Sequence, residues 1–467
     1  MEPRNCDCDD QKPEIVTGPI HRRDFFKLGV GGALSLALAS RMTSSLFADD
    51  KKPAKGNEKY DKPPAQVTGK AKSVILLWMD GGPSQMDTWD PKSGINGGSL
   101  KRIKTKIEGC EFTEPMAPLA EVSDKLAVIR SMTSREGNHQ RARYYLHTGY
   151  PPTGTLKHPS VGSVTALKKQ NPDLDLPHFV SVNNPSFGAG FLGVSYGPFV
   201  VQDPSRPPDN VAYAAGIDAE RFDRRMKLLD KVDGAFAASR GGLMTEGKDA
   251  IYEKSLKLMR SPLLKAFDIS EEGESVKKAY GIDDGVGIGS KNGGAAKQGQ
   301  RGDKFGAGAL MARRLVEVGV PFVECTLGGW DTHQDNFGRV AGLAGSLAPA
   351  YAALIKDLED RKLLDSTLVL CMGEFGRTPR INPNDGRDHF PGCFSVAMAG
   401  GGVKGGQMIG ATADDGMTVA KSPWTVPDLI ATICTAMGID HTEWFQTPVG
   451  RPIQISNKGK LIEGLLA

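Results

Sequence analysis

Carboxylates and imidazoles in this chain stand where apolar segments begin or end. The residues of this kind that we predict to be metal ligands are Asp80, Asp331, His333, Glu374, Asp388 and His389. Carboxylates that lie close together repel one another unless a cation neutralises them. Mixed Asp, Glu and His ligands suit Zn, Mn, Fe or Mg rather than a metal that prefers thiolates. The pattern therefore predicts a centre with one or two divalent ions, Zn, Mn or Mg, which could act on a phosphate or sulfate ester.

Each of these residues alone also has an ordinary structural explanation. An Asp after a strand often forms a turn or a helix cap, so Asp331 alone would indicate only a turn. Glu374 could form an ion pair with Arg377, and a single His333 would more often lie at the surface without a ligand. Their joint occurrence at four strand ends favours a site.

The apolar segments around these residues are predicted to be buried strands. They are short, continuous and rich in Val, Leu and Ile, as is typical of parallel strands that are covered on both faces. The predicted strands are 73–79, 125–132, 177–184, 321–329, 366–375 and 393–402. The predicted helices between them are 160–170, 217–282, 305–319, 346–364 and 425–440. This alternation predicts an α/β fold, with a mostly parallel central sheet and helices on both faces, whose ligands bind at the carboxyl ends of the strands.

The N-terminal part of the chain is predicted to be an export signal. Arg22 and Arg23 precede a short apolar stretch that is not long enough to cross a bilayer comfortably. This pattern predicts a twin-arginine signal peptide over 1–48, cleaved after Ala39 or Ala48. We therefore expect a periplasmic or extracellular protein that contacts a membrane only through an uncleaved signal segment.

The remainder of the chain is predicted to form one domain. Residues 49–72 are rich in Lys and Pro and are predicted to be a disordered linker. The domain covers 73–467 and includes a helical and Gly-rich insertion at about 210–302. The net charge of +3, with both signs mixed along the chain, gives no indication of a nucleic-acid partner.

The segment "GEFGRTPRINPNDGRDHFPG", residues 373–392, joins two of the predicted strands and contains almost no apolar side chains. Its carboxylate and its Asp-His pair are among the predicted ligands. Arg377 and Arg387 in the same segment are predicted to contact an anionic substrate. The residues between Glu374 and His389 would then form a basic rim above the cavity.

Several segments together resemble the alkaline phosphatase–sulfatase superfamily. Within it, the chain resembles a bacterial, planctomycete-type, twin-arginine-exported family of sulfatase-like proteins that is catalogued as a domain of unknown function. The segments that carry the resemblance are "LLWMDGGPSQMDTWDPK", "ARRLVEVGVPFVE", "GWDTHQDNF", "LLDSTLVLCMGEFGRTPRIN", "GRDHFPGCFSVAMAGGGVKGG" and "PDLIATICTAMGID". This resemblance implies an alkaline phosphatase-like fold.

The resemblance also implies roles for individual residues. Asp80 matches the first metal-binding acid of the superfamily, and His389 matches its late His before a strand. Asp331 and His333 fall in the segment that supplies an Asp and a His, with Asp335 as an alternative partner. Glu374 stands where an Asp followed by His is expected.

The chain departs from the superfamily at the nucleophile. It has no C/S-x-P-x-R motif, so formylglycine chemistry is not expected. Thr148-Gly149 matches a phosphatase motif, but the position of the hydroxyl nucleophile is occupied by His139, after Asn138. His139 could be a nucleophile, or a metal ligand beside metal-activated water, or the sign of a lost activity. We favour the second interpretation.

The predicted start of a helix at His139 provides candidates for contacts with an anion. Asn138 is a good helix N-cap, which would place His139 at the positive end of the helix. Arg141 and Arg143 follow, and either could bind a phosphate or sulfate group, together with Asn138. The sequence thus predicts an exported, metal-dependent hydrolase of phosphate or sulfate esters, with sulfated or phosphorylated glycans as candidate substrates. The alternative is a non-catalytic binding or assembly protein with the same fold.

Overall fold

The computed structural model describes residues 67–467, apart from 210, 241–242 and 283–301. The predicted signal peptide over 1–48 and most of the predicted linker over 49–72 lie outside the described residues. So does most of the Gly-rich part of the predicted insertion. Within the described part of the chain, no helix is both long and apolar enough to cross a membrane.

All six predicted strands are present in one central sheet. They are β1 (Ser73–Asp80), β4 (Leu126–Thr133), β5 (Phe179–Val182), β7 (Phe322–Gly328), β8 (Thr367–Met372) and β11 (Phe394–Ala399). The strand order is β12-β4-β11-β8-β1-β7-β5-β6, and β15 also pairs with β4. The three short strands that the sequence did not indicate are β6 (Phe199–Val201), β12 (Gln407–Ile409) and β15 (Trp424–Thr425).

The sheet is mostly parallel, and β11 is the exception among the long strands. β1 pairs in parallel with β7 and β8, whereas β11 runs antiparallel to β4 and β8. The start of β11 therefore lies at the same edge of the sheet as the ends of β1, β7 and β8. This direction explains how His389, which precedes β11, reaches residues that follow the other strands.

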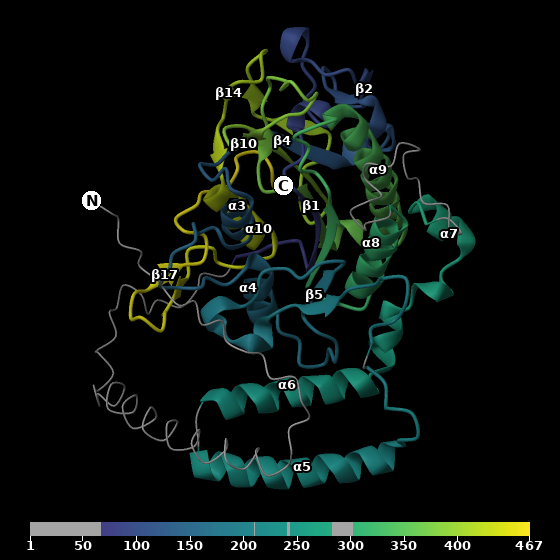
Figure 1. Cartoon of the computed structure of the whole chain (residues 1–467), viewed down its shortest axis with the longest axis vertical. Coiled ribbons are helices and arrows are strands. Elements are labelled where there is room, and N and C mark those ends of the chain that lie inside the picture. Colours follow the sequence, from purple (N-terminus) through teal and green to yellow (C-terminus); the bar gives the residue numbers. More distant parts are fainter. Residues whose placement is uncertain (1–66, 210, 241–242, 283–301) are drawn as a thin grey trace, which may run out of the picture. The chain divides into compact units, whose positions relative to one another are not determined.

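Helices cover both faces of the sheet, as the continuous apolar strands predict (Figure 1). Along β1, Ile75 and Leu77 pack into the core with α8 (Gly302–Glu317) and α9 (Asn336–Asp360). The alternate residues Leu76 and Trp78 pack into a second core. The helices of this second face are α3 (His139–Thr148), α4 (Val161–Lys168) and α10 (Val426–Ala436). Burial of both faces of β1 confirms the predicted α/β fold class.

The remaining α-helices and strands lie outside the central sheet. The predicted helical segment 217–282 contains α5 (Ala219–Arg240), α6 (Leu243–Arg260) and α7 (Glu274–Ala279), with 3-10 turns between α6 and α7. The other short elements are α2 (Ala117–Ala120), β2 (Arg102–Lys104), β3 (Glu111–Thr113), β9 (Gly376–Arg377), β10 (His389–Phe390), β13 (Ala411–Thr412), β14 (Val419–Lys421), β16 (Trp444–Phe445) and β17 (Ile453–Gln454). Helix α9 begins before the predicted residue 346, because Val340 and Leu343 already continue its buried face.

Candidate metal centre

The end of β1 and the segment after β7 approach each other closely at the carboxyl edge of the sheet. Asp80 ends β1, and Gly81 follows it with φ of 118°. A Cβ atom on Gly81 would lie only 2.5 Å from the backbone nitrogen of Asp331. Glycine is therefore required at this position for its left-handed backbone and for the space that it leaves. The contact brings Asp331 beside the end of β1.

The polar segment 373–392 folds back on itself as a small hairpin. Strands β9 and β10 pair antiparallel, so that His389 lies opposite Arg377. Arg387 anchors the hairpin, because its Nε donates to Oδ2 of the buried Asp87 at 2.7 Å. Gly386 packs directly against the backbone of His333. The hairpin thus places His389 over the same point that Asp331 and His333 reach from β7.

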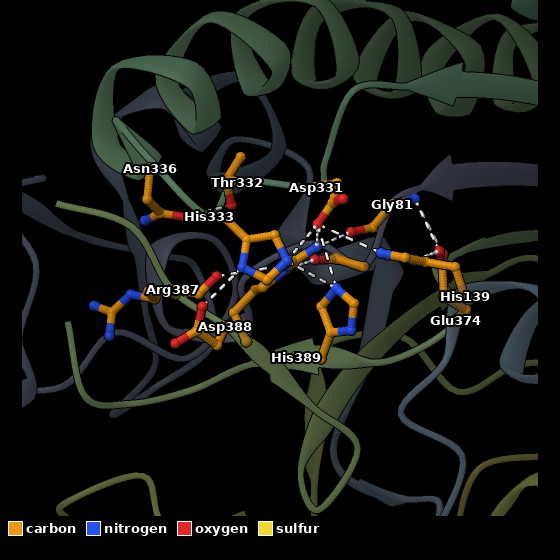
Figure 2. A network of polar contacts seen from close by, with 12 residues as sticks. Gly81, His139, Asp331, Thr332, His333, Asn336, Glu374, Arg387, Asp388 and His389 are labelled. Carbon is orange, nitrogen blue, oxygen red and sulfur yellow. Dashed lines mark hydrogen bonds and ion pairs between the residues drawn. The ribbon is translucent and has the colours of Figure 1, made fainter. Parts of the chain in front are cut away.

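Three imidazole nitrogens converge on one carboxylate oxygen (Figure 2). The Nε2 atoms of His139, His333 and His389 lie 3.4, 3.2 and 3.4 Å from Oδ1 of Asp331. The Nε2 atoms of His333 and His389 are 3.0 Å apart. These residues come from the start of α3, from the segment after β7 and from β10. Segments far apart in the sequence therefore meet at a single point.

The outer nitrogen of each imidazole faces an acceptor. Nδ1 of His139 lies 2.6 Å from Glu374 Oε1, and Nδ1 of His333 lies 2.7 Å from Asp388 Oδ1. Nδ1 of His389 lies 2.8 Å from the carbonyl oxygen of Gly137. Because all three partners can only accept, each Nδ1 carries the proton, and a neutral ring then presents a lone pair at Nε2. Carboxylate or carbonyl partners of this kind are typical of imidazoles that bind metals.

The residues present fit a divalent cation. Nitrogen and oxygen ligands about 2.0–2.1 Å from a tetrahedral Zn²⁺ are about 3.3 Å apart, which is close to the distances around Asp331 Oδ1. Nε2 of His139 is buried and has no hydrogen-bond partner. His139, Asp331 and His389 can all direct ligand atoms to a common point, and His333 lies beside them. The residues that would hold such an ion are therefore His139, Asp331 and His389, with His333 as the fourth candidate.

Asp331 is ionised and firmly held in this arrangement. Partial burial favours the neutral form of its carboxyl group, but the hydrogen bond and charge of Arg377, with the nearby imidazoles, lower its pKa to about 2. Arg377 donates from one terminal nitrogen to Asp331 Oδ1 at 2.6 Å. Its Nε donates to the carbonyl oxygen of Gly82 at 2.8 Å. Arg377 therefore links Asp331 to the turn after β1.

Of the other three predicted ligands, Asp388 contacts Nδ1 of His333, whereas Asp80 and Glu374 contact Arg143. Nε of Arg143 lies 2.6 Å from Asp80 Oδ1 and 3.5 Å from Glu374 Oε1. Glu374 is fully buried and accepts the backbone N–H of Gly81 at 3.0 Å. Burial and the charge of Glu374 raise the pKa of Asp80, whereas Arg143 opposes that rise. Of these two acids, Glu374 supports the convergence point through its contact with His139.

The structure corrects the predicted roles of two arginines. Arg377 and Arg387 have 0% of their surface exposed, and backbone carbonyls and carboxylates bind their guanidinium groups. They hold the hairpin in place and are not available to a substrate, so of the three arginines in the predicted basic rim only Arg380 is exposed. Arg141 is exposed and pairs with Glu136 through two contacts of 2.7 Å. Asn138 caps α3 by accepting the N–H of Arg141 at 3.3 Å.

The sequence did not indicate some residues of the centre, and it did not decide between His333 and Asp335 as a ligand. The carbonyl oxygen of Gly137 orients His389, and no residue type could have indicated it. Asn382 donates to the carbonyl oxygen of His333 at 2.9 Å and to Asp388 at 3.2 Å. Asp335, the alternative to His333, begins α9 with φ of 47° and is not among the converging side chains.

Fold and site define the class of this protein: an α/β protein with a candidate metal centre at the carboxyl edge of its sheet. The model of a family described as "Protein of unknown function (DUF1501)" matches residues 71–466. The chain belongs to this family, as its sequence predicted. A search of proteins with curated functions finds no match.

Solved structures that resemble the chain come from the alkaline phosphatase superfamily. A superfamily protein from Vibrio parahaemolyticus is 11% identical, with 91% of this chain and 77% of that chain covered and a TM-score of 0.38. The lipoteichoic acid synthase LtaP from Listeria monocytogenes is 10% identical, with coverages of 83% and 76% and a TM-score of 0.36. An alkaline phosphatase from the Antarctic bacterium TAB5 is 12% identical, with coverages of 76% and 96% and a TM-score of 0.31. Similarities this low say nothing of the activity of this chain.

Proposed function

We propose that this protein is an exported, metal-dependent hydrolase of phosphate or sulfate esters. The observation that carries the proposal is the convergence of three Nε2 lone pairs on the Asp331 carboxylate, with His139 Nε2 buried and without a hydrogen-bond partner. Arg377 neutralises Asp331 from one side, and a divalent ion would satisfy the three Nε2 atoms that face the same carboxylate. A divalent ion held here would supply the means to activate water and to polarise an ester.

The residues of the chain would orient the metal ligands and bind the anionic substrate. Asp331 stays ionised, and Glu374 and Asp388 keep His139 and His333 in the orientation that presents Nε2. His139 is the first residue of α3, so the positive end of the helix dipole faces the centre and favours an anionic substrate. Arg143 is 34% exposed and is the guanidinium that we assign to the anionic oxygens of the ester.

The substrate class and location of the protein follow from the sequence expectations. The resemblance to sulfatase-like proteins favours sulfated or phosphorylated glycans as the substrate. The twin-arginine pattern at 22–23 favours export to the periplasm or beyond. Growth of a producing strain with and without the twin-arginine pathway, followed by cell fractionation, tests the location. Retention in the cytoplasm of the normal strain would contradict it.

Turnover assays on the purified protein test the activity. The protein is stripped with EDTA, reloaded with Zn²⁺ or Mn²⁺, and assayed with an aryl phosphate and an aryl sulfate. We expect product only after reloading, and none from His389→Gln. The matched control is His178→Gln, which changes a histidine outside the centre. Metal binding without product from either ester would instead support the non-catalytic binding protein. The absence of a hydroxyl among the described side chains that contact Asp331 makes that outcome worth measuring.

A further inference from the structure

Two carboxylates at this edge of the sheet share one guanidinium group. Asp80 and Glu374 are 294 residues apart in the sequence, and Arg143 contacts both of them. Two carboxylates in such proximity, one of them fully buried, need a neutralising cation. In this protein the cation that the structure provides is a side chain.

The oxygens of these two carboxylates are already occupied. Arg143 places Nε 2.6 Å from Oδ1 and a terminal nitrogen 2.7 Å from Oδ2 of Asp80, and Trp78 Nε1 donates to Oδ1 at 3.1 Å. Oε1 of Glu374 contacts the backbone N–H of Gly81 and Nδ1 of His139, and Oε2 accepts the same N–H at 3.2 Å. Donors therefore surround this pair of acids, whereas Asp331 Oδ1 accepts from Arg377 on one side and faces three imidazole nitrogens on the other.

His139 connects the two halves of the centre, which are the Asp80–Glu374 pair and the surroundings of Asp331. Its Nδ1 side belongs to the half that Arg143 neutralises, and its Nε2 side belongs to the half around Asp331, where Arg377 donates to Oδ1 at 2.6 Å. Each half thus contains one guanidinium group, but only the half around Asp331 also presents three imidazole Nε2 atoms, which are suitable metal ligands. This difference separates two positions that a simple list of acids and histidines would treat alike.

We infer that Arg143 takes the place of a second metal ion, so that each chain binds one divalent ion and not two. This inference rests on the proposed metal centre and deepens it. It assigns to Arg143 the neutralisation of Asp80 and Glu374, and it assigns the single ion to His139, Asp331, His333 and His389. Removing the guanidinium opens a second site between the two acids.

Counting metal ions tests the inference without any turnover. The EDTA-treated protein is titrated with Zn²⁺ in a calorimeter, and the bound metal is measured by mass spectrometry after dialysis. We expect one ion per chain in the wild type and two in Arg143→Ala. Arg143→Lys keeps the positive charge and is expected to bind one. The matched control is Arg141→Ala. Arg141 lies on the same helix and pairs with Glu136, and Arg141→Ala is also expected to bind one ion.

A further substitution locates the second ion. In the Arg143→Ala background, Asp80→Asn is expected to return the count from two to one. Two ions in the wild type, or one ion in folded Arg143→Ala, would overturn the inference. If circular dichroism shows that Arg143→Ala is unfolded, Arg143→Gln is counted in its place with the same expectation. The ion count and the turnover assay test different statements. One bound ion without turnover would support this inference and contradict the hydrolase activity, whereas one bound ion with turnover would support both.

Discussion

Nδ1 of His139 lies 2.6 Å from Oε1 of Glu374, a carboxylate that no solvent reaches. Burial favours the neutral form of His139, but its hydrogen bond with Glu374 and the charges of Glu374 and Asp331 outweigh burial and raise its pKa. Glu374 is itself fixed by the backbone N–H of Gly81. The start of α3 and the end of β1 therefore hold one imidazole in a single orientation, with Nε2 directed at Asp331.

This relationship predicts the effect of Glu374→Gln. The neutral amide is a weaker acceptor for Nδ1–H of His139, so the ring is a less basic ligand and less firmly oriented. Loss of such an outer partner costs about 10–100-fold in metal affinity, which titration calorimetry with Zn²⁺ measures. The matched control is Glu136→Gln, since Glu136 pairs with exposed Arg141. An unchanged affinity in folded Glu374→Gln would show that Glu374 does not support the ion.

The strands of this protein are predictable because burial on both faces leaves a direct mark in the sequence. Segments such as 73–79 contain only residues that a buried strand accepts. All six predicted strands appear in the central sheet. The short edge strand β12 carries no such mark, since Gln407 and Met408 are only partly buried. The helix start at His139 is predictable as well, because Asn138 is a favourable cap.

The sequence does not predict in the same way which acid the histidines surround and which acid Arg143 neutralises. Asp80 and Asp331 both follow buried strands, and their local sequences do not distinguish them. The difference arises because α3 brings Arg143 to one acid and His139 to the other. The burial of Arg387 likewise depends on Asp87, a partner 300 residues away in the chain. Long-range packing of this kind decides the role of a charged side chain.

The proposed ligands predict a metal-dependent gain in stability. An ion that binds only the folded protein stabilises it by about 2.7 kcal/mol when its free concentration is 100 times its Kd. Urea unfolding with and without Zn²⁺ measures this gain, and EDTA is expected to remove it. His389→Gln is expected to lose most of it, whereas His178→Gln keeps it. Equal unfolding curves of the wild type with and without Zn²⁺ would argue against the centre.

The buried pair of Asp87 and Arg387 predicts a large loss of stability on substitution. Arg387 contacts both oxygens of Asp87, and Asp87 also accepts from Ser84 and Asn336. Arg387→Met leaves a buried carboxylate without its countercharge, which costs about 3–5 kcal/mol in the free energy of unfolding. Chemical denaturation of the metal-free protein measures this loss.

An exposed ion pair provides the control for this substitution. Arg206 and Asp209 also form a close pair, but both side chains are largely in solvent. Arg206→Met is expected to change the free energy of unfolding far less than Arg387→Met, because solvent screens the exposed pair. Similar losses from Arg387→Met and Arg206→Met would contradict the structural role of Arg387. Because Arg387 anchors the hairpin of His389, Arg387→Met is also expected to weaken Zn²⁺ binding.

A second buried imidazole predicts how the stability depends on pH. Nδ1 of His147 lies 2.7 Å from the carbonyl oxygen of Arg143, and its Nε2 lies 3.2 Å from Oε1 of buried Glu324. Both nitrogens therefore face acceptors, and both can donate only when the ring is charged. Burial disfavours the charged ring, but the charge of Glu324 and these hydrogen bonds outweigh it and raise the pKa of His147.

The sign of the expected pH dependence follows from that raised pKa. In the unfolded chain His147 titrates near its ordinary value of about 6.5, and in the folded protein it titrates at a higher pH. Its contribution to stability is therefore fully present below about 6.5 and is lost as the pH rises through the folded pKa. The difference in the free energy of unfolding between the wild type and His147→Gln is expected to shrink from pH 6 to pH 9. Chemical denaturation in EDTA measures it without a contribution from metal binding.

His178 provides a control of opposite sign for this pH series. Burial lowers the pKa of His178, so the contribution of its neutral ring is present above the ordinary pKa and is lost as the pH falls. The difference between the wild type and His178→Gln is thus expected to grow or stay level from pH 6 to pH 9. A His147→Gln difference that stays constant over the same range would mean that His147 is neutral in the folded protein. Glu324 would then be a buried carboxylate held chiefly by Ser186, whose hydroxyl donates to it at 2.5 Å.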